Sequence, residues 1–378
     1  MLLRAFGPAA TEPLGEPVLH GFDQASGFGL ASRIASRQGP ALLTAELGDE
    51  DAQALLQRRL ASVAGEMRFQ ATAGRVRAVA AGLPLVFLKG FALRLAGVTA
   101  AGSRPSGDLD VLSPTGEVGS LYQALVAAGF RPSGTPEMEH QLPTLVAPTG
   151  DAVELHRCVL GVRPAGSRRS ATFETLSQAG LLEPAPGWPG QFVPRREVLL
   201  AHAAVHALVQ HGYTPDVYPP LRLVADWIDL GASEPGFESG LAPVASLVAR
   251  EVPGPELAAL ARLCRQLAQG DLSALHDPSA DDGAAALLHH FLAGALDEAY
   301  ASALKLEMLA RPLSDSPRLW ARLKALKTAV LPSDAELEKI YGSGPGPATR
   351  LGRRLWRPFD LVGRTVRHTA RVLSGRRR

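Results

Sequence analysis

The segment DLDVL, residues 108–112, constrains this chain more than any other stretch of its sequence. Its pattern predicts a short apolar strand that carries two acids, Asp108 and Asp110. Because side chains alternate between the two faces of a strand, both carboxylates are expected on the same face. Burying two uncompensated carboxylates together is unfavourable by several kcal/mol per ion. A hard divalent cation such as Mg²⁺ or Mn²⁺ would remove that cost, since it prefers carboxylate and phosphate oxygens as ligands.

A positively charged turn lies directly upstream, in the segment VFLKGFALRLAG. Residues 83–88 predict a short buried strand, and a helix is expected to begin at Gly90. Backbone N–H groups at the start of a helix can bind an anion, and Lys89 and Arg104 add positive charge suited to phosphates. An isolated Asp-x-Asp is more typical of a solvated surface turn, but this combination favours metal-assisted phosphate chemistry.

A third acid on a neighbouring strand would complete such a site. The segment AVELH, residues 152–156, alternates in the same way and offers Glu154, with His156 on the same face as a candidate substrate contact. Asp151 is the alternative, but it falls in the predicted turn of a hairpin between HQLPTLVAP and AVELHRCVL. We therefore prefer Glu154. Metal ions on such carboxylates can activate an attacking hydroxyl and stabilise a leaving group.

The hydrophobic pattern predicts an α+β fold with a small mixed sheet between two helical regions. Over residues 81–160 the expected order of elements is β–α–β–α–β–β. The chain divides into an N-terminal helical region at 1–80, an α/β core at 81–195, a helical domain at 196–341, and a Gly/Pro linker with an Arg-rich tail at 342–378.

The segments FLKGFALRLAG, SRPSGDLDVL and VELHR together resemble the nucleotidyltransferase superfamily of polymerase-β type. They are most similar to the branch labelled uncharacterised nucleotidyltransferases. The resemblance implies a mixed-sheet nucleotidyltransferase core, Mg²⁺, and a nucleoside triphosphate, with ATP expected. By position it also implies roles for six residues: Asp108, Asp110 and Glu154 as catalytic metal ligands, and Lys89, Gly90 and Arg104 as contacts of the phosphates.

Two residues depart from the pattern of that superfamily. Phe91 stands where the superfamily has a serine after the glycine, so handling of the triphosphate must differ or depend on Lys89. Glu154 stands where this branch more often has aspartate, and its longer side chain would shift the position of the carboxylate.

The segments LLAHAAVHALVQHG and LRLVADWIDL resemble the helical half of the same branch, with paired histidines and an Arg-x-x-x-Asp pattern. The resemblance points to substrate contacts from His206, Arg222 and Asp226. His202 and His206 have the spacing of zinc ligands, but the glutamate of a zincin is absent between them, and packed core histidines are the more ordinary outcome. Arg222 and Asp226 could also pair along one helix face.

The charge balance argues against extended binding of nucleic acid. The chain has 39 Lys and Arg, 37 Asp and Glu, and a net charge of +2, whereas phosphate neutralisation dominates nucleic-acid affinity. Basic residues are concentrated in residues 350–378, where ten arginines alternate with apolar residues and a single acid. Such a segment predicts contact with an anionic membrane surface or nucleic acid. A packed or solvated C-terminal helix is the alternative.

Cysteine content indicates the compartment. Cys158 and Cys264 are too few for a disulfide framework, which fits a reducing cytoplasm. The sequence shows no apolar run of membrane-spanning length and no secretory pattern at its N-terminus. We expect a soluble cytoplasmic protein whose tail could make it peripheral to the membrane.

The leading hypothesis is a Mg²⁺-dependent enzyme that transfers a nucleotidyl group from a nucleoside triphosphate to a hydroxyl or phosphate. Its acceptor could be a small molecule, a glycan or lipid-linked precursor, a protein, or RNA. One alternative is a non-catalytic nucleotide-binding or assembly module that docks through its basic tail. Another is an RNA-directed nucleotidyltransferase. Retention of three acids favours the enzyme, and Phe91 slightly favours the module.

Overall fold

The computed structural model describes residues 30–135, 137–210 and 219–270, together with Ala284, Leu287, Phe291 and Gly352. The chain divides into two compact units, Met1–Ala295 and Leu296–Arg378. All helices and strands described below belong to the first unit. Apart from Gly352, the predicted linker and tail lie outside the described residues, so membrane contact by residues 350–378 stays a prediction, as do the proposed domain boundaries. Among the described residues, no helix has the length and apolar character needed to cross a membrane.

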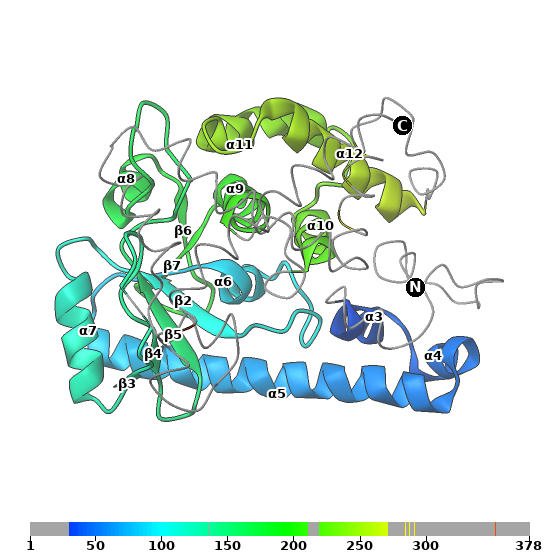
Figure 1. Cartoon of the computed structure of the whole chain (residues 1–378), viewed down its shortest axis with the longest axis horizontal. Helices are drawn as coiled ribbons and strands as arrows, with labels where there is room; N and C mark the ends of the chain where they lie inside the picture. The colour runs from blue at the N-terminus through cyan, green and yellow to red at the C-terminus, as the bar shows by residue number, and fades with distance from the viewer. Residues whose placement is uncertain are drawn as a thin grey trace. The chain divides into compact units, whose positions relative to one another are not determined.

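Three helices precede the sheet, in the region for which the hydrophobic spacing predicted helical structure: α3 (Ala31–Arg37), α4 (Pro40–Leu47) and α5 (Asp49–Ala80). Helix α4 starts with a proline, which suits the first turn because its missing N–H would have no partner there. Helix α5 spans 32 residues and has three acids in its first turn, where they interact favourably with the helix dipole. Figure 1 shows α5 running along one side of the sheet.

A seven-stranded mixed sheet has the order β3-β4-β5-β2-β1-β7-β6. Its strands are β1 (Val86–Phe87), β2 (Asp108–Leu112), β3 (Arg131–Pro132), β4 (Leu145–Val146), β5 (Ala152–His156), β6 (Leu182–Pro184) and β7 (Phe192–Pro194). The central strand β2 is parallel to β5 and antiparallel to β1, and β1 is parallel to β7. The outer pairs β3–β4, β4–β5 and β6–β7 are antiparallel. The predicted α+β class with a mixed sheet is confirmed.

Helices connect and follow these strands (Figure 1). They are α6 (Lys89–Leu95), α7 (Val118–Ala127), α8 (Phe173–Gln178), α9 (Arg196–Ala204), the π-helical turn η1 (Val205–Gln210), α10 (Pro220–Asp229), the 3₁₀ turn η2 (Phe237–Gly240), α11 (Leu241–Val248) and α12 (Gly254–Gln269). The helix predicted from residue 196 is confirmed, but it changes to π geometry at Val205. The helical pattern expected beyond residue 270 lies outside the described residues, except for three isolated positions.

The two faces of the sheet differ because side chains alternate along β2 and β5. One face is apolar and packs against α5 and α7 in a buried core that includes Leu109, Val111, Val153 and Leu155. The opposite face receives the residues between them: Asp108, Asp110, Glu154 and His156. Burial of the apolar face therefore fixes the register of the strands, since a slip by one residue would turn the acids into the core.

Several strands differ from the sequence-based expectation. Of the expected hairpin strand HQLPTLVAP, only Leu145–Val146 forms β4. The strand expected over residues 83–88 is limited to β1: the Leu85 N–H donates to the side chain of Gln191 at 3.0 Å, and Leu88 is already the N-cap of α6. Strands β3, β6 and β7 were not predicted. Each has only two or three residues and contains a proline, which is a poor signal for a strand.

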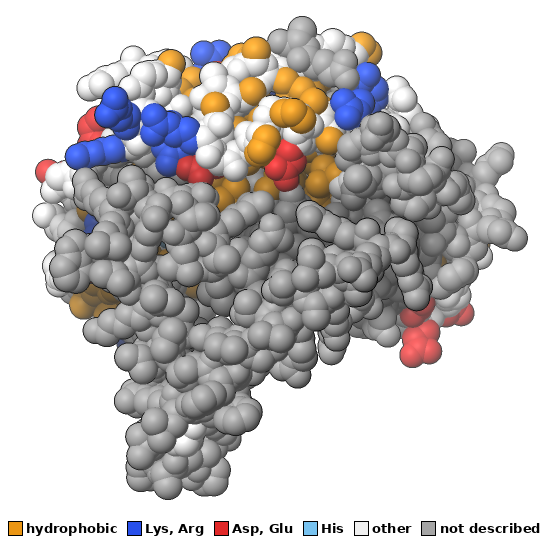
Figure 2. Space-filling view, turned by 45° about the horizontal axis from the view of Figure 1, so that its top comes forward, with side chains coloured by type: hydrophobic (Ala, Val, Ile, Leu, Met, Phe, Trp, Pro, Cys, Tyr) orange, Lys and Arg blue, Asp and Glu red, His pale blue; other side chains and the backbone are white. Residues whose placement is uncertain are grey.

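The described part of the surface in Figure 2 shows Lys and Arg side chains in separate groups, with apolar and acidic side chains between them. This mixed surface agrees with the low net charge of +2. Both cysteines are free, Cys158 half-buried and Cys264 buried, as expected for a chain without a disulfide framework.

Candidate active site

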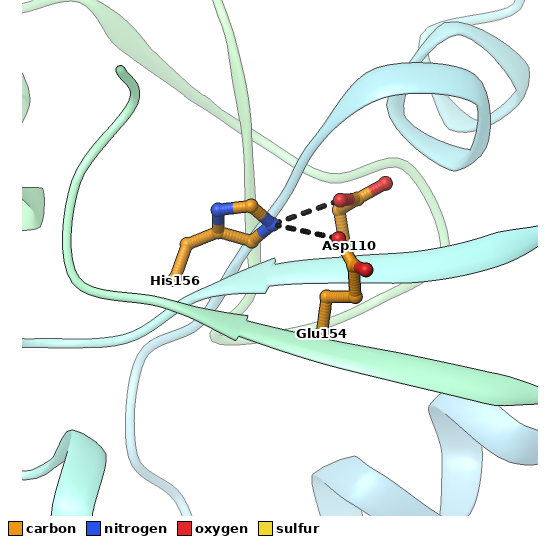
Figure 3. A group of neighbouring side chains, drawn as sticks. All are labelled: Asp110, Glu154 and His156. Atoms are coloured by element: carbon orange, nitrogen blue, oxygen red, sulfur yellow. Dashed lines mark hydrogen bonds and ion pairs between the residues drawn. The ribbon is translucent and has the colours of Figure 1, made fainter. Parts of the chain in front are cut away.

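Parallel pairing of β2 with β5 brings the predicted acids together. In this register Asp110 lies opposite Glu154, and Leu112 lies opposite His156. Figure 3 shows the side chains of Asp110, Glu154 and His156 converging on the polar face of the sheet. Nε2 of His156 is 2.8 Å from Oδ1 of Asp110 and 3.7 Å from Oε2 of Glu154. The cluster is mostly buried, with Asp110 only 1% exposed.

Lys89 also enters this cluster. Its Nζ atom is 2.7 Å from Oδ1 of Asp110 and 3.7 Å from Oε2 of Glu154. Lys89 is the first residue of α6, one position before the predicted start of that helix. The sequence predicted a phosphate contact for this lysine, and the structure adds an ion pair with the acids. Because α6 has only seven residues, the backbone N–H groups at its start contribute little, and the positive charge at this turn comes mainly from side chains.

The charges of this cluster act on one another. Repulsion from Asp110, followed by burial, raises the pKa of Asp108 to about 7. Burial alone would raise the pKa of Asp110, but Lys89 and His156 outweigh it and hold that pKa well below the usual range. Burial opposes the charge on Lys89, yet the carboxylates led by Asp110 raise its pKa. Adjacent carboxylates resist double ionisation, which is why the pKa of Asp108 lies above its ordinary value.

The acids fit a hard divalent cation. Among the described residues, one group offers three metal-binding side chains with ligand atoms within 4.8 Å of one another: Asp110, Glu154 and His156. The carboxylate of Asp108 lies outside that group and lines the adjoining cavity. Carboxylate oxygens suit Mg²⁺ or Mn²⁺ better than an imidazole nitrogen does. His156 is therefore more suited to orienting Asp110 through their hydrogen bond.

The alternative third acid, Asp151, serves the fold instead. Its Oδ2 atom accepts hydrogen bonds from Oγ1 of Thr72 at 2.7 Å and Oγ1 of Thr149 at 2.8 Å. Its other oxygen lies 3.5 Å from Nε of Arg68. These contacts tie the β4–β5 turn to α5, so Glu154 is the acid that joins Asp110.

A cavity of about 570 Å³ opens beside the acids, a volume typical of small-molecule sites. Its walls include all three predicted phosphate contacts and two of the predicted acids: Lys89, Gly90, Arg104, Asp108 and Glu154. The helical half contributes His206 and Arg222 to the wall; their predicted contact with a substrate stays a prediction. The cavity therefore unites residues of the sheet with residues more than fifty positions later in the chain.

Asp226 joins the helical half to the core in a different way. Its two carboxylate oxygens accept hydrogen bonds from Nε and Nη2 of Arg104, at 2.7 and 2.9 Å. Both side chains are nearly buried, 12% and 3% exposed. Bidentate pairs of this kind fix the plane of the guanidinium group. Asp226 thus determines where Arg104 lies at the cavity wall.

Comparison with known protein families decides the identity of this arrangement. The sequence model of a family described as uncharacterised nucleotidyltransferase matches residues 32–237 of the chain. The chain belongs to this nucleotidyltransferase family. The match covers more than half of the 378 residues and includes every predicted site residue. No curated protein and no solved structure matches the chain significantly.

Gly90 has a steric role at this site. A Cβ atom at this position would overlap the guanidinium group of Arg104 and the hydroxyl of Ser106. Nη1 of Arg104 also donates a long hydrogen bond of 3.4 Å to Oγ of Ser106. A glycine therefore allows the loop before β2 to close over the start of α6.

The paired histidines His202 and His206 line a small cavity next to the acidic cluster, together with Lys89. His202 is buried beside this cavity of about 20 Å³, and burial lowers the pKa of His202 to about 3. His206 lies within η1, and its Nδ1 atom is hydrogen-bonded to Gln210. In the described part of the chain, neither histidine belongs to a group of three metal-binding side chains, so a zinc site is not supported there.

Several cavity residues were missed from the sequence. Ser106, His140, Gln141 and Gln210 line the cavity. The ring centroid of His140 is 5.8 Å from that of His156, and burial followed by repulsion from His156 lowers the pKa of His140 to about 4. Ser106 had a signal, because it directly precedes the Gly-Asp that opens β2. The other three are single polar residues whose spacing carries no motif.

Proposed function

We propose that the protein is a metal-dependent nucleotidyltransferase that moves a nucleotidyl group from a nucleoside triphosphate, with ATP as the first candidate, to a hydroxyl or phosphate of an acceptor. The observation that supports this most is the register of β2 and β5. It sets Asp110 opposite Glu154 beside a cavity lined by Lys89 and Arg104. Membership of the nucleotidyltransferase family gives the reaction class.

Three carboxylates would hold the cation: Asp108, Asp110 and Glu154. A positive charge is already stable at this place, since Lys89 lies within ion-pair distance of two of them. When bound, Mg²⁺ or Mn²⁺ would neutralise charge on the triphosphate and stabilise the attacking and leaving oxygens. His156 keeps the Asp110 carboxylate oriented through its hydrogen bond.

The remaining residues position the substrates. Lys89 and Arg104 donate hydrogen bonds to the phosphates in the cavity that both line, and Asp226 holds Arg104 in place. The acceptor oxygen attacks the α-phosphorus, the bond to the β-phosphate oxygen breaks, and pyrophosphate leaves. Glu154 accepts the proton of an attacking hydroxyl. Positioning and charge neutralisation supply most of the rate enhancement in such reactions.

His206 and Arg222 contribute substrate contacts from the helical half. Both line the cavity, and the guanidinium of Arg222 suits a phosphate or carboxylate group. These residues face the acids from a separate part of the chain, so we assign them to the acceptor or to the ribose and base.

The test uses the full-length protein with Mg²⁺, a cell extract as the source of acceptors, and each nucleoside triphosphate labelled either at the α- or at the γ-phosphate. Nucleotidyl transfer labels an acceptor from the α position only and releases pyrophosphate. Asp110→Asn should abolish labelling. Asp151→Asn is the matched control, because it alters a buried acid of the same sheet that lies outside the cluster. Labelling from the γ position would contradict the proposal.

One observation favours a second candidate, a nucleotide-binding module without transfer activity. The ion pair between Lys89 and Asp110 neutralises part of the acidic cluster without any metal. Such a module would bind the nucleotide in the same cavity but would release no pyrophosphate with any acceptor fraction. The α-label experiment therefore separates the two functions.

A further inference from the structure

Lys89 takes the position of a cation within the acidic cluster. Its ammonium nitrogen is 2.7 Å from Asp110 and 3.7 Å from Glu154, and its side chain is only 16% exposed. Buried carboxylates need a compensating positive charge. In this structure that charge comes from the chain itself, at the place where the proposed function requires a divalent cation.

The backbone holds Lys89 in this position. Its φ of 48° lies in the left-handed region, which residues other than glycine rarely adopt. The preceding Leu88 N–H donates a 3.0 Å hydrogen bond to the carbonyl oxygen of Asp110, which fastens the turn to β2. An unfavourable backbone conformation persists when its surroundings fix it, and such positions concentrate at ligand sites.

The Lys89 side chain also has a second direction available. Lys89 lines the large cavity of about 570 Å³ as well as the acidic cluster. A lysine side chain is long and flexible and carries three donors, so its ammonium group can turn from the carboxylates to an anion in that cavity. A nucleoside triphosphate would provide such an anion.

We propose that Lys89 is a resident counterion of the acidic cluster. Its ammonium group leaves the carboxylates only when a divalent cation and a triphosphate bind together. This inference rests on the proposed function. A free divalent cation would meet the ammonium group of Lys89 at the carboxylates, and like charges repel. With a triphosphate present, Lys89 moves to the phosphate oxygens and vacates the carboxylates. Cation and nucleotide therefore bind with positive coupling, which is reciprocal between the two ligands.

The test measures binding of Mn²⁺ to the full-length protein by the loss of the free-ion electron paramagnetic resonance signal. Each titration is done with Mn²⁺ alone and with the α,β-methylene analogues of the four nucleoside triphosphates, corrected for Mn²⁺ bound to analogue alone. The wild type should bind Mn²⁺ about tenfold more tightly when the preferred analogue is present, within the usual range of such coupling. Lys89→Met should bind Mn²⁺ alone about tenfold more tightly than the wild type and lose most of the coupling.

Two further variants sharpen the comparison. Lys89→Arg keeps the positive charge and should bind Mn²⁺ alone as weakly as the wild type. Arg94→Met removes one positive charge from the same helix, but Arg94 pairs with Glu66 at 3.3 Å and not with the acidic cluster. It should therefore behave like the wild type, which excludes an effect of net charge alone.

The outcomes separate this inference from the proposed function. Equal affinity of the wild type and Lys89→Met for Mn²⁺ alone would overturn the counterion role while the proposed function stands. If no protein binds Mn²⁺ with or without any analogue, the metal-dependent function itself fails. If Lys89→Met does not fold, the wild type still decides, since tight binding of Mn²⁺ without an analogue would overturn the inference.

Discussion

Breaking the ion pair between Arg104 and Asp226 should destabilise the protein by about 3–5 kcal/mol, the usual effect of removing one partner from a buried pair. Both oxygens of Asp226 are engaged, at 2.7 and 2.9 Å, and the two side chains are 12% and 3% exposed. Two unit charges about 4 Å apart interact by about 4 kcal/mol at an effective dielectric constant near 20. Asp226→Asn removes the charge with little change in shape, and Arg104 then loses its bidentate carboxylate.

Urea unfolding at pH 7, followed by circular dichroism, gives the free energy of unfolding for Asp226→Asn, Arg104→Met and the double variant. Each single variant should lose about 3–5 kcal/mol, and the double variant should lose less than the sum, with a coupling energy of about 1.5–3 kcal/mol. Glu234→Gln is the matched control. It breaks an exposed pair with Arg196 and should cost under about 1 kcal/mol. Additive losses below about 1 kcal/mol for the Arg104–Asp226 variants would refute the reasoning.

Three further predictions concern backbone conformation, pH and the steric role of Gly90. Ala81→Gly should stabilise the protein by about 0.5–1 kcal/mol because Ala81 has φ 50°. Gly74→Ala should stabilise it by a similar amount, because Gly74 lies inside α5 with open space around it. Thermal unfolding measures both variants, with Ala78→Gly as a destabilising control. The pKa of His202 falls from 6.5 to about 3 on folding, so the unfolded chain binds more protons between these values and the wild type loses stability as pH falls from 6.5. His202→Gln should remove that loss, so the free energies of unfolding of variant and wild type should diverge by about 1.4 kcal/mol per pH unit. If the difference between the two free energies does not depend on pH between 6.5 and 4, His202 is charged when folded. Gly90→Ala should displace Arg104 and Ser106 and weaken binding of the Mn²⁺–analogue complex about tenfold, an energy of about 1.4 kcal/mol. Gly119→Ala is the control: it adds a methyl group in open space on α7 and should not change binding. Equal binding by both variants would contradict the steric role of Gly90.

The sequence alone predicted the parts of the site that depend on local periodicity. Alternation along DLDVL places Asp108 and Asp110 on one face, and alternation along AVELH does the same for Glu154 and His156. The apolar residues between them must enter the core, so the acids have only the opposite face available. The same local signals predicted the long helices, the β4–β5 hairpin and the mixed sheet. The motifs on these elements also resemble the nucleotidyltransferase family, and the comparison confirmed that family.

Tertiary structure decided which of these side chains meet. The sequence could not place Asp110 directly opposite Glu154, because the relative shift of two parallel strands depends on the packing of their shared apolar face. It gave two interpretations of Asp226 but not its pairing with Arg104, 122 positions earlier. Strands β6 and β7 were also hidden, since each has only three residues and a proline, and β7 joins the sheet through one residue pair with the distant β1.

Lys89 shows the division most clearly. Its place beside a glycine at a strand–helix boundary predicted positive charge near phosphates, and that much follows from neighbouring residues. Its ion pair with Asp110 arises only when β1 and β2 are antiparallel neighbours and the turn adopts a left-handed conformation. Local sequence sets the backbone preferences and the face of each side chain, whereas electrostatic partners are set by which strands the hydrophobic core brings together.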